Sequence, residues 1–220
     1  ECDHIAVLKA YRGWQRVRRG GGGGEAAYIS AHFLSRQALA SLERGARQLR
    51  ESLSAAGLLP EGGGQNRHAD CMAWLKALVA AALYPRVATV SWSPKPKVAG
   101  APPSEGSVTL RAAALQGAKG ARNAQGKIQD KVVALHPSAV LHGSQPRLAA
   151  LAALAAGKKG AAAAPLLAFY GRVVTSRDFI TDATLVGPMH LLLLAGSRAE
   201  PSEEPSGGAV VIELDGWLRF

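Results

Sequence analysis

The sequence lacks the residue patterns that carry the chemistry of common enzymes. It has no Gly-x-x-x-x-Gly-Lys-Ser/Thr phosphate loop and no Asp-Glu-x-His motif. The His-Glu-x-x-His and Gly-x-Ser-x-Gly patterns of hydrolases are also missing. Gly157-Lys-Lys-Gly160 has neither the spacing of a phosphate loop nor its Mg²⁺-binding hydroxyl. On its own the chain should therefore neither bind nor hydrolyse ATP, and we predict no catalytic residues in it.

Cysteine is scarce, and long apolar runs are missing. Cys2 and Cys71 are the two cysteines, far apart and without a second Cys or His at metal-ligand spacing. We therefore expect reduced thiols in an intracellular, reducing compartment, and no metal site. No apolar run has the length of a membrane span, and the N-terminus is unlike a signal peptide. We expect no membrane partner, and the missing initiator Met predicts a fragment of a longer protein.

Acidic residues are outnumbered by basic ones. Lys and Arg total 26 against 16 Asp and Glu, which leaves a formal net charge of +10 at pH 7. Such an excess favours a polyanionic partner, either nucleic acid or an acidic membrane surface. The alternative is an ordinary solvated basic surface, or a GC-rich coding bias towards arginine.

The first 85 residues have the periodicity of helices. Asp3, a candidate N-cap, opens a helix to about Val17 that precedes a run of glycines. Arg12, Arg16, Arg18 and Arg19 in this region could either meet phosphate or simply be solvated at a helix end.

Two further helical segments follow. Glu25 to Gly57 is predicted as helical, with Ser35 as an N-cap and Gly57 as the stop. Its apolar stripe, expected to pack in a core or against another helix, is Leu39, Leu42, Ala46, Leu49 and Leu53. A helix over Cys71 to Leu83 is expected to bury Cys71, Trp74, Leu75, Leu78, Val79 and Ala82.

From residue 86 the pattern changes to short strands. The segments with strand character are Val87–Trp92, Val108–Arg111, Lys131–Leu135, Leu166–Val174, Phe179–Val186, Val210–Leu214 and Trp217–Phe220. Asp215-Gly216 is a strong hairpin turn, and Gly187-Pro188 opens a short helix. We interpret this half of the chain as a five-stranded barrel with one short helix. These are the elements of an OB-type barrel, a fold that often binds oligonucleotides.

We therefore predict an α+β chain with two domains. Residues 1–85 form a helical region, and residues 86–220 form an OB-like barrel. Low-complexity insertions are expected at residues 93–107, 112–129, 143–164 and 197–208. The Ala run in the third of these has no pattern that indicates packing, and the fourth is polar and loose.

Lys131 to Val140 is the segment that points most directly to a binding site. A short strand ends there at a corner fixed by Pro137, which holds the preceding His136 in an extended conformation. The corner presents the imidazole of His136 and the hydroxyl of Ser138. Either group could contact a ligand, or His136 could simply cap the strand end. Tyr170 is interpreted as a half-buried strand aromatic rather than a stacking platform, and Asp182 as a loop anchor rather than a base.

Several short motifs resemble the helicase-associated region and C-terminal OB-fold domain of DEAH/DExH-box RNA helicases. In the helical part these are Tyr11-Arg-Gly-Trp14, Phe33-Leu-Ser-Arg-Gln37, Trp74-Leu-Lys-Ala77, Ala82-Leu-Tyr-Pro85 and Val87-Ala88. In the barrel part they are Val133-Ala-Leu-His-Pro-Ser138, Phe169 to Thr184 and Asp215-Gly-Trp-Leu-Arg-Phe220. The motifs run in family order from one end of the chain to the other.

The resemblance implies the accessory part of an ATP-dependent RNA helicase. In that family two upstream motor domains bind ATP and Mg²⁺, while the helical region and the OB-fold close over the RNA. This stretch should itself hold no cofactor. The expected partners are single-stranded RNA, the upstream motor domains of the same chain and helicase cofactor proteins. The expected nucleic-acid-binding residues are Lys131, His136, Ser138, Arg172, Thr175 and Arg177.

The sequence departs from the family pattern at two places, and two other functions stay open. Ala139-Val140-Leu141 stands where family members usually have Ser-Val-Asn, and Lys9 where Asn is common. One alternative is a stand-alone OB-fold protein that binds nucleic acid without a motor. The other is a protein-interaction scaffold with the basic Ala/Gly insertions as tethers.

Overall fold

The structure, a computed structural model, describes residues 2–21, 23–59, 66–94, 106–113, 130–157, 165–202 and 211–219. The chain divides into two compact units, one formed by Ile5–Cys71 and the other by Glu1–His4 with Met72–Phe220. N-terminal helices precede a closed barrel and a short helix, so the predicted α+β fold with an OB-like barrel is confirmed. The chain passes from one unit to the other after His4 and again after Cys71.

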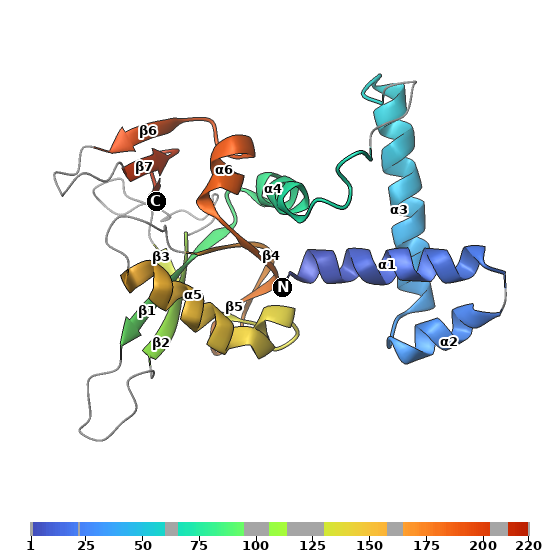
Figure 1. The fold of residues 1–220 in the computed structure, drawn as a ribbon, viewed down its shortest axis with the longest axis horizontal. Helices are drawn as coiled ribbons and strands as arrows, with labels where there is room; N and C mark the ends of the chain where they lie inside the picture. The colour runs from blue at the N-terminus through green and yellow to red at the C-terminus, as the bar shows by residue number, and fades with distance from the viewer. Residues whose placement is uncertain are drawn as a thin grey trace. The chain divides into compact units, whose positions relative to one another are not determined.

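The first unit consists of helices α1 (Asp3–Arg19, from Ile5 onward), α2 (Gly24–Ala31) and α3 (Arg36–Ala55) (Figure 1). The single helical segment expected from Glu25 to Gly57 is two helices, because the chain turns at Phe33, which has a positive φ of 51°. The Ser35 hydroxyl accepts a hydrogen bond from the Ala38 N–H at 3.3 Å, which confirms the predicted cap of α3.

The apolar stripe of α3 is mostly uncovered within its own unit. Leu39 is 3% exposed, as expected of a core residue. Leu42, Leu49 and Leu53, by contrast, are 45%, 67% and 42% exposed, so the prediction that the whole stripe packs is wrong for this unit. Helical periodicity identifies an apolar face, but it does not show whether a neighbouring element covers that face.

The barrel of the second unit is closed in the order β1-β2-β3-β5-β4. Its strands are β1 (Val87–Pro94), β2 (Gly106–Ala113), β3 (Asp130–Leu135), β4 (Leu166–Val174) and β5 (Asp178–Val186). Only the β3–β5 pair within this barrel is parallel. Because side chains alternate along a strand, every second residue enters the interior. The barrel core includes Ala88, Val90, Leu110, Val133, Leu135, Leu167, Phe169 and Ile180.

A helix that was not predicted to pack covers one side of the barrel. Helix α5 (Gln145–Gly157) lies across β1 and β2, preceded by the 3-10 turn η1 (Val140–Ser144) (Figure 1). Leu148 and Ala152 are 2% and 3% exposed and belong to the barrel core. No pattern in the sequence indicated that the Ala run packs, but it is helical and its helix α5 packs on the barrel.

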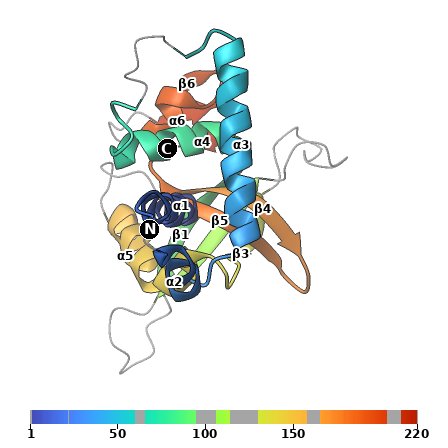
Figure 2. The same ribbon diagram turned by 90° about the vertical axis from the view of Figure 1, so that its right-hand side faces the viewer.

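Helix α4 (Met72–Leu83) lies beside α6 (Pro188–Leu194) (Figures 1 and 2). Its buried residues are Ala77 and Ala80, whereas Trp74 and Leu78 are 49% and 56% exposed. The predicted inner face is therefore wrong for its exposed members, Cys71, Trp74, Leu78 and Ala82, whereas Leu75 and Val79 are half-buried. The buried face of α4 thus consists of small side chains, and the large apolar residues Trp74 and Leu78 are exposed.

The C-terminal strands form a separate sheet in the order β6-β7-β8. These strands are β6 (Ala199–Ser202), β7 (Val211–Leu214) and β8 (Leu218–Arg219). Asp215 and Gly216 have φ values of 50° and 73°, as a tight hairpin turn requires, and this confirms the predicted turn. The segment 197–208 was expected to be loose, but β6 lies within it. Residues 95–105, 114–129, 158–164 and 203–208 of the expected insertions lie outside the described residues.

A hydrogen-bonded cluster holds this sheet to the end of α4. The Tyr84 hydroxyl donates to Asp215 Oδ2 at 2.7 Å and accepts from Trp217 Nε1 at 3.1 Å. Burial, reinforced by the neighbouring carboxylate, raises the pKa of Tyr84. Burial alone would raise the pKa of Asp215, but hydrogen bonds from Tyr84 and from the Ser197 and Arg198 N–H groups lower it.

Candidate nucleic-acid interface

The His136 corner is a small, internally bonded unit at the end of β3. The His136 N–H donates to the Ile180 carbonyl of β5 at 3.0 Å, which fixes the corner against the neighbouring strand. The Ser138 N–H donates to His136 Nδ1 at 3.2 Å, and Ser138 Oγ lies 2.7 Å from the same nitrogen. The ring also contacts Phe179 edge-on, with 5.8 Å between the ring centroids.

These contacts determine which imidazole nitrogen can meet a ligand. A backbone N–H can only donate, so Nδ1 of His136 is the acceptor in this arrangement. The neutral ring then carries its proton on Nε2. The His136 side chain is half-buried and Ser138 is exposed. With Nδ1 as the acceptor, the Ser138 hydroxyl donates its proton to that nitrogen. The corner therefore offers the Nε2–H of His136 as a donor to a phosphate oxygen, and the Ser138 oxygen as an acceptor for a ribose hydroxyl or a base N–H.

The departure from the family pattern beyond this corner lies inside the molecule. Ala139 and Leu141 are 5% and 1% exposed and belong to the barrel core. Side chains at these two positions point away from the surface that carries His136. The apolar residues therefore change the packing beneath the corner and leave its exposed polar groups in place.

Asp3 ties the start of the chain to the barrel directly behind the corner. Its two carboxylate oxygens accept hydrogen bonds from the Val140 N–H at 2.6 Å and the Ala183 N–H at 2.7 Å. Next to it, the Thr184 hydroxyl lies 2.8 Å from Cys2 Sγ and 2.7 Å from His4 Nδ1. The sequence indicated Asp3 only as a helix cap, since no local pattern reveals a partner more than a hundred residues away.

An ion pair holds the β4–β5 hairpin next to the corner. Arg172 Nε donates to Asp178 Oδ1 at 2.7 Å, and Arg172 Nη2 donates to Asp178 Oδ2. Their side chains are 17% and 15% exposed. Hydrogen bonding to Arg172 lowers the pKa of Asp178, and the same contact raises the pKa of Arg172. Arg172 is thus engaged in holding the hairpin, and only its remaining N–H groups could reach a phosphate.

The predicted binding residues lie on two strands, β3 and β4, and in the segments that follow them, and β5 lies between these two strands. Residue 134 of β3 is the register partner of Phe179 on β5, so Lys131 at the start of β3 lies towards the β4–β5 turn. Thr175 and Arg177 form that turn, where the Thr175 N–H donates to the Arg177 carbonyl at 2.9 Å. The side chains of Lys131, Thr175 and Arg177 are exposed.

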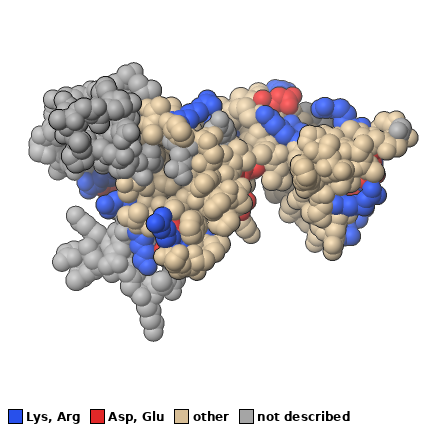
Figure 3. All heavy atoms as spheres, turned by 90° about the horizontal axis from the view of Figure 1, so that it is seen from below, with Lys and Arg blue, Asp and Glu red and all other residues tan. Residues whose placement is uncertain are grey.

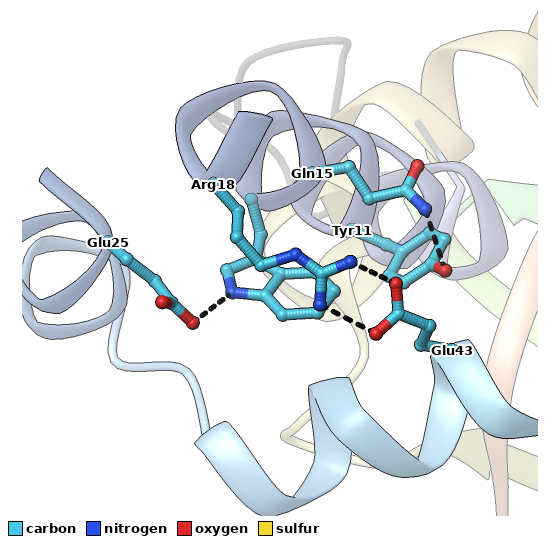
Figure 4. Close-up of polar contacts among 6 residues, drawn as sticks. Tyr11, Gln15, Arg18, Glu25 and Glu43 are labelled. Carbon is cyan, nitrogen blue, oxygen red and sulfur yellow. Dashed lines mark hydrogen bonds and ion pairs between the residues drawn. The ribbon is translucent and has the colours of Figure 1, made fainter. Parts of the chain in front are cut away.

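Basic side chains elsewhere are dispersed, and several of them have partners within the chain. On the face seen in Figure 3, Lys and Arg form small separate groups on both units rather than one continuous field. Arg18 donates to both carboxylate oxygens of Glu43 (Figure 4), and its guanidinium carbon lies 4.4 Å from the centroid of the buried Trp14 ring. Arg12 donates to Asp70 at 3.4 Å. The positive charges of Arg12 and Arg18 thus have partners within the helical unit, and a phosphate ligand is not needed to explain them.

No helix in the described part of the chain is long and apolar enough to cross a membrane.

Comparisons with known proteins identify relatives along nearly the whole chain. The ATP-dependent RNA helicase dhx29 of Xenopus laevis is 25% identical over 99% of this chain, and the putative ATP-dependent RNA helicase DHX57 of Mus musculus is 28% identical over 99%. The ATP-dependent DNA/RNA helicase DHX36 of Homo sapiens is 35% identical over 40% of the chain. These matches cover 14%, 15% and 9% of the respective relatives, and no family model matches. The resemblance indicated by the sequence motifs is confirmed.

Proposed function

We propose that this chain is the RNA-binding accessory part of a DEAH/DExH-box RNA helicase, a family whose C-terminal region it resembles. It binds single-stranded RNA and closes the RNA channel of motor domains in the parent protein. Those motor domains would bind ATP and Mg²⁺, since this chain has no phosphate-loop sequence. The chain spans about 14% of the length of relatives such as dhx29, so the parent activity rests on the resemblance.

The observation that carries the proposal is the grouping of donors around β3, β5 and β4. Lys131, Arg177 and Thr175 are exposed near the start of β3, and the corner at the other end of β3 adds the Nε2–H of His136 as a donor and the Ser138 oxygen as an acceptor. Cations neutralise phosphates, whereas hydroxyl and imidazole groups can reach sugar or base edges. OB-type barrels commonly receive oligonucleotides on this kind of surface.

The physical role follows from how firmly these groups are held. The corner is bonded to Ile180, the hairpin is held by the Arg172–Asp178 pair, and Asp3 anchors the backbone behind them. A surface held in this way can stay bound to single-stranded RNA with little rearrangement while the motor domains move the RNA. The chain would thus bind and orient the RNA, and the motor domains would use ATP hydrolysis to move it.

Fluorescence anisotropy with a labelled single-stranded 15-nucleotide RNA tests the proposal. The logarithm of affinity should fall linearly with the logarithm of salt, with a slope of about −0.7 per phosphate contacted. Replacing Lys131 and Arg177 together with alanine should make the slope shallower by about 1.4, which corresponds to two lost contacts.

The matched control replaces Arg44 and Arg50, two exposed arginines of α3, with alanine. This control removes the same net charge from the other unit, so it should leave the slope nearly unchanged. Equal effects of the two double substitutions would refute a specific grip at the barrel. Absence of RNA binding at low salt would refute RNA binding by this chain altogether.

A further inference from the structure

Tyr170 on β4 presents its aromatic ring to solvent. The side chain is 62% exposed, whereas the preceding Phe169 is 0% exposed in the barrel core. Alternation along the strand therefore turns Tyr170 outward. The interpretation of Tyr170 as a half-buried strand aromatic is wrong, because nothing in the described part of the chain covers most of the ring.

The strand that carries Tyr170 is held rigidly on both sides of it. Phe169 is paired with Ala183, and Gly171 with Thr181, so Tyr170 lies between two register pairs of the β4–β5 ladder. A Cβ atom added to Gly171 would lie 2.3 Å from Thr181 Oγ1, which shows how closely the strands approach at this point. The ring is thus attached to backbone with little freedom to move.

Arg86 places a positive charge over one face of this ring, which leaves the other face for a base. Arg86 Nη1 donates to the Tyr170 carbonyl at 3.2 Å, and the Arg86 guanidinium carbon lies 5.7 Å from the centroid of the Tyr170 ring. The Arg86 carbonyl in turn accepts from the Phe169 N–H at 3.0 Å. Within the described residues no carboxylate forms an ion pair with Arg86, so its charge is available to a ligand.

We propose that Tyr170 and Arg86 form a stacking platform for one nucleobase of single-stranded RNA. An exposed aromatic ring accepts the face of any base, and the adjacent guanidinium contacts the phosphate next to it. Phe33 is more exposed, at 97%, but it lies in the helical unit, and no cation is described over its ring. The platform rests on the proposed RNA-binding function and assigns that function a site for bases, which phosphate contacts alone do not provide.

Two oligonucleotides of equal charge separate stacking from phosphate binding. The probes are a labelled 15-mer of riboadenosine and an abasic 15-mer with the same ribose-phosphate backbone, titrated by anisotropy against the 220-residue chain. Tyr170→Ala should weaken binding of the riboadenosine 15-mer by about 5-fold to about 150-fold and leave the abasic probe within about twofold. Tyr170→Phe keeps the ring and should bind both probes as the unmodified chain does.

The variants should fold normally, because the substituted ring is exposed and the Arg86 contact is made to the backbone carbonyl. The urea midpoint of each variant checks this directly. If the unmodified chain binds the riboadenosine probe and Tyr170→Ala binds it equally well, the platform is refuted while the proposed function stands. If the unmodified chain binds neither probe at low salt, both are refuted. Equal weakening on the two probes would show a loss of phosphate contacts and also refute stacking.

Discussion

Replacing Asp3 with asparagine should loosen the barrel at the position where the His136 corner is attached. Asp3 is 7% exposed, and its carboxylate accepts the Val140 and Ala183 N–H groups at 2.6 and 2.7 Å. Asparagine keeps the shape but removes the charge and turns one acceptor into an NH₂ group. That NH₂ group would face a backbone donor, which leaves a buried N–H without a partner.

The expected magnitude follows from these two bonds. A hydrogen bond to a charged group contributes about 1.5–3 kcal/mol, and an unsatisfied buried donor adds a desolvation penalty of similar size. Asp3→Asn should therefore lower the free energy of unfolding of the barrel unit by about 2–4 kcal/mol. Such a loss is large beside a typical domain stability of about 5–15 kcal/mol.

Native-state hydrogen exchange with urea denaturation measures this effect where it arises. The Val140 and Ala183 amides should lose protection, and the urea midpoint should fall. Asp70→Asn is the matched control, since Asp70 is a fully exposed partner of Arg12 and its replacement should leave the urea midpoint nearly unchanged. An Asp3→Asn protein as stable as this control, with both amides still protected, would refute the clamp.

Three further substitutions test contacts elsewhere in the chain. Asp178→Asn should lower the free energy of unfolding at pH 7 by about 1.5–3 kcal/mol, because it breaks the pair with Arg172. Since the pKa of Asp178 is lowered in the folded state, the pair stabilises above about pH 4, and urea midpoints should show this benefit fading as the pH falls further. Ser35→Ala should cost about 1 kcal/mol by removing the α3 cap, measured by circular dichroism on thermal unfolding. Tyr84→Phe removes the donor to Asp215 and should increase amide exchange in β7 and β8, whereas unchanged exchange there would contradict its role.

Local signals in the sequence predicted the elements well. Ser35 caps α3, Gly57 has the positive φ of 68° that a helix stop favours, and Asp215-Gly216 forms the turn between β7 and β8. Leu166–Val174 is a strand with the predicted bounds. Each of these features depends on backbone chemistry within a few residues, which a single sequence contains in full.

Packing partners could not be predicted in the same way. Apolar periodicity suggested that Trp74 and Leu78 face the core, but the buried residues of α4 are Ala77 and Ala80. The low-complexity Ala segment gave no sign that Leu148 would enter the barrel core. These outcomes depend on which elements meet in three dimensions, and periodicity alone does not contain that information.

The sequence marks the strand ends that the candidate site residues follow, and the role of these residues in binding stays a prediction. His136 and Ser138 are bonded to each other as a corner, and the β4–β5 turn carries Thr175 and Arg177. Arg172 was predicted without its partner, although Asp178 takes up two of its donors. The Asp3 clamp joins positions too distant for any local pattern to connect.

Photo-crosslinking of a 4-thiouridine-substituted single-stranded RNA to the 220-residue chain, followed by mass spectrometry of the linked peptides, tests the central claim most directly. If the barrel grips RNA through β3, β4 and β5, crosslinks should map to residues 131–138 and 170–177, and high salt should reduce them. Crosslinks confined to the arginine-rich helix over residues 36–55, or spread evenly over all basic segments, would contradict a grip at the barrel.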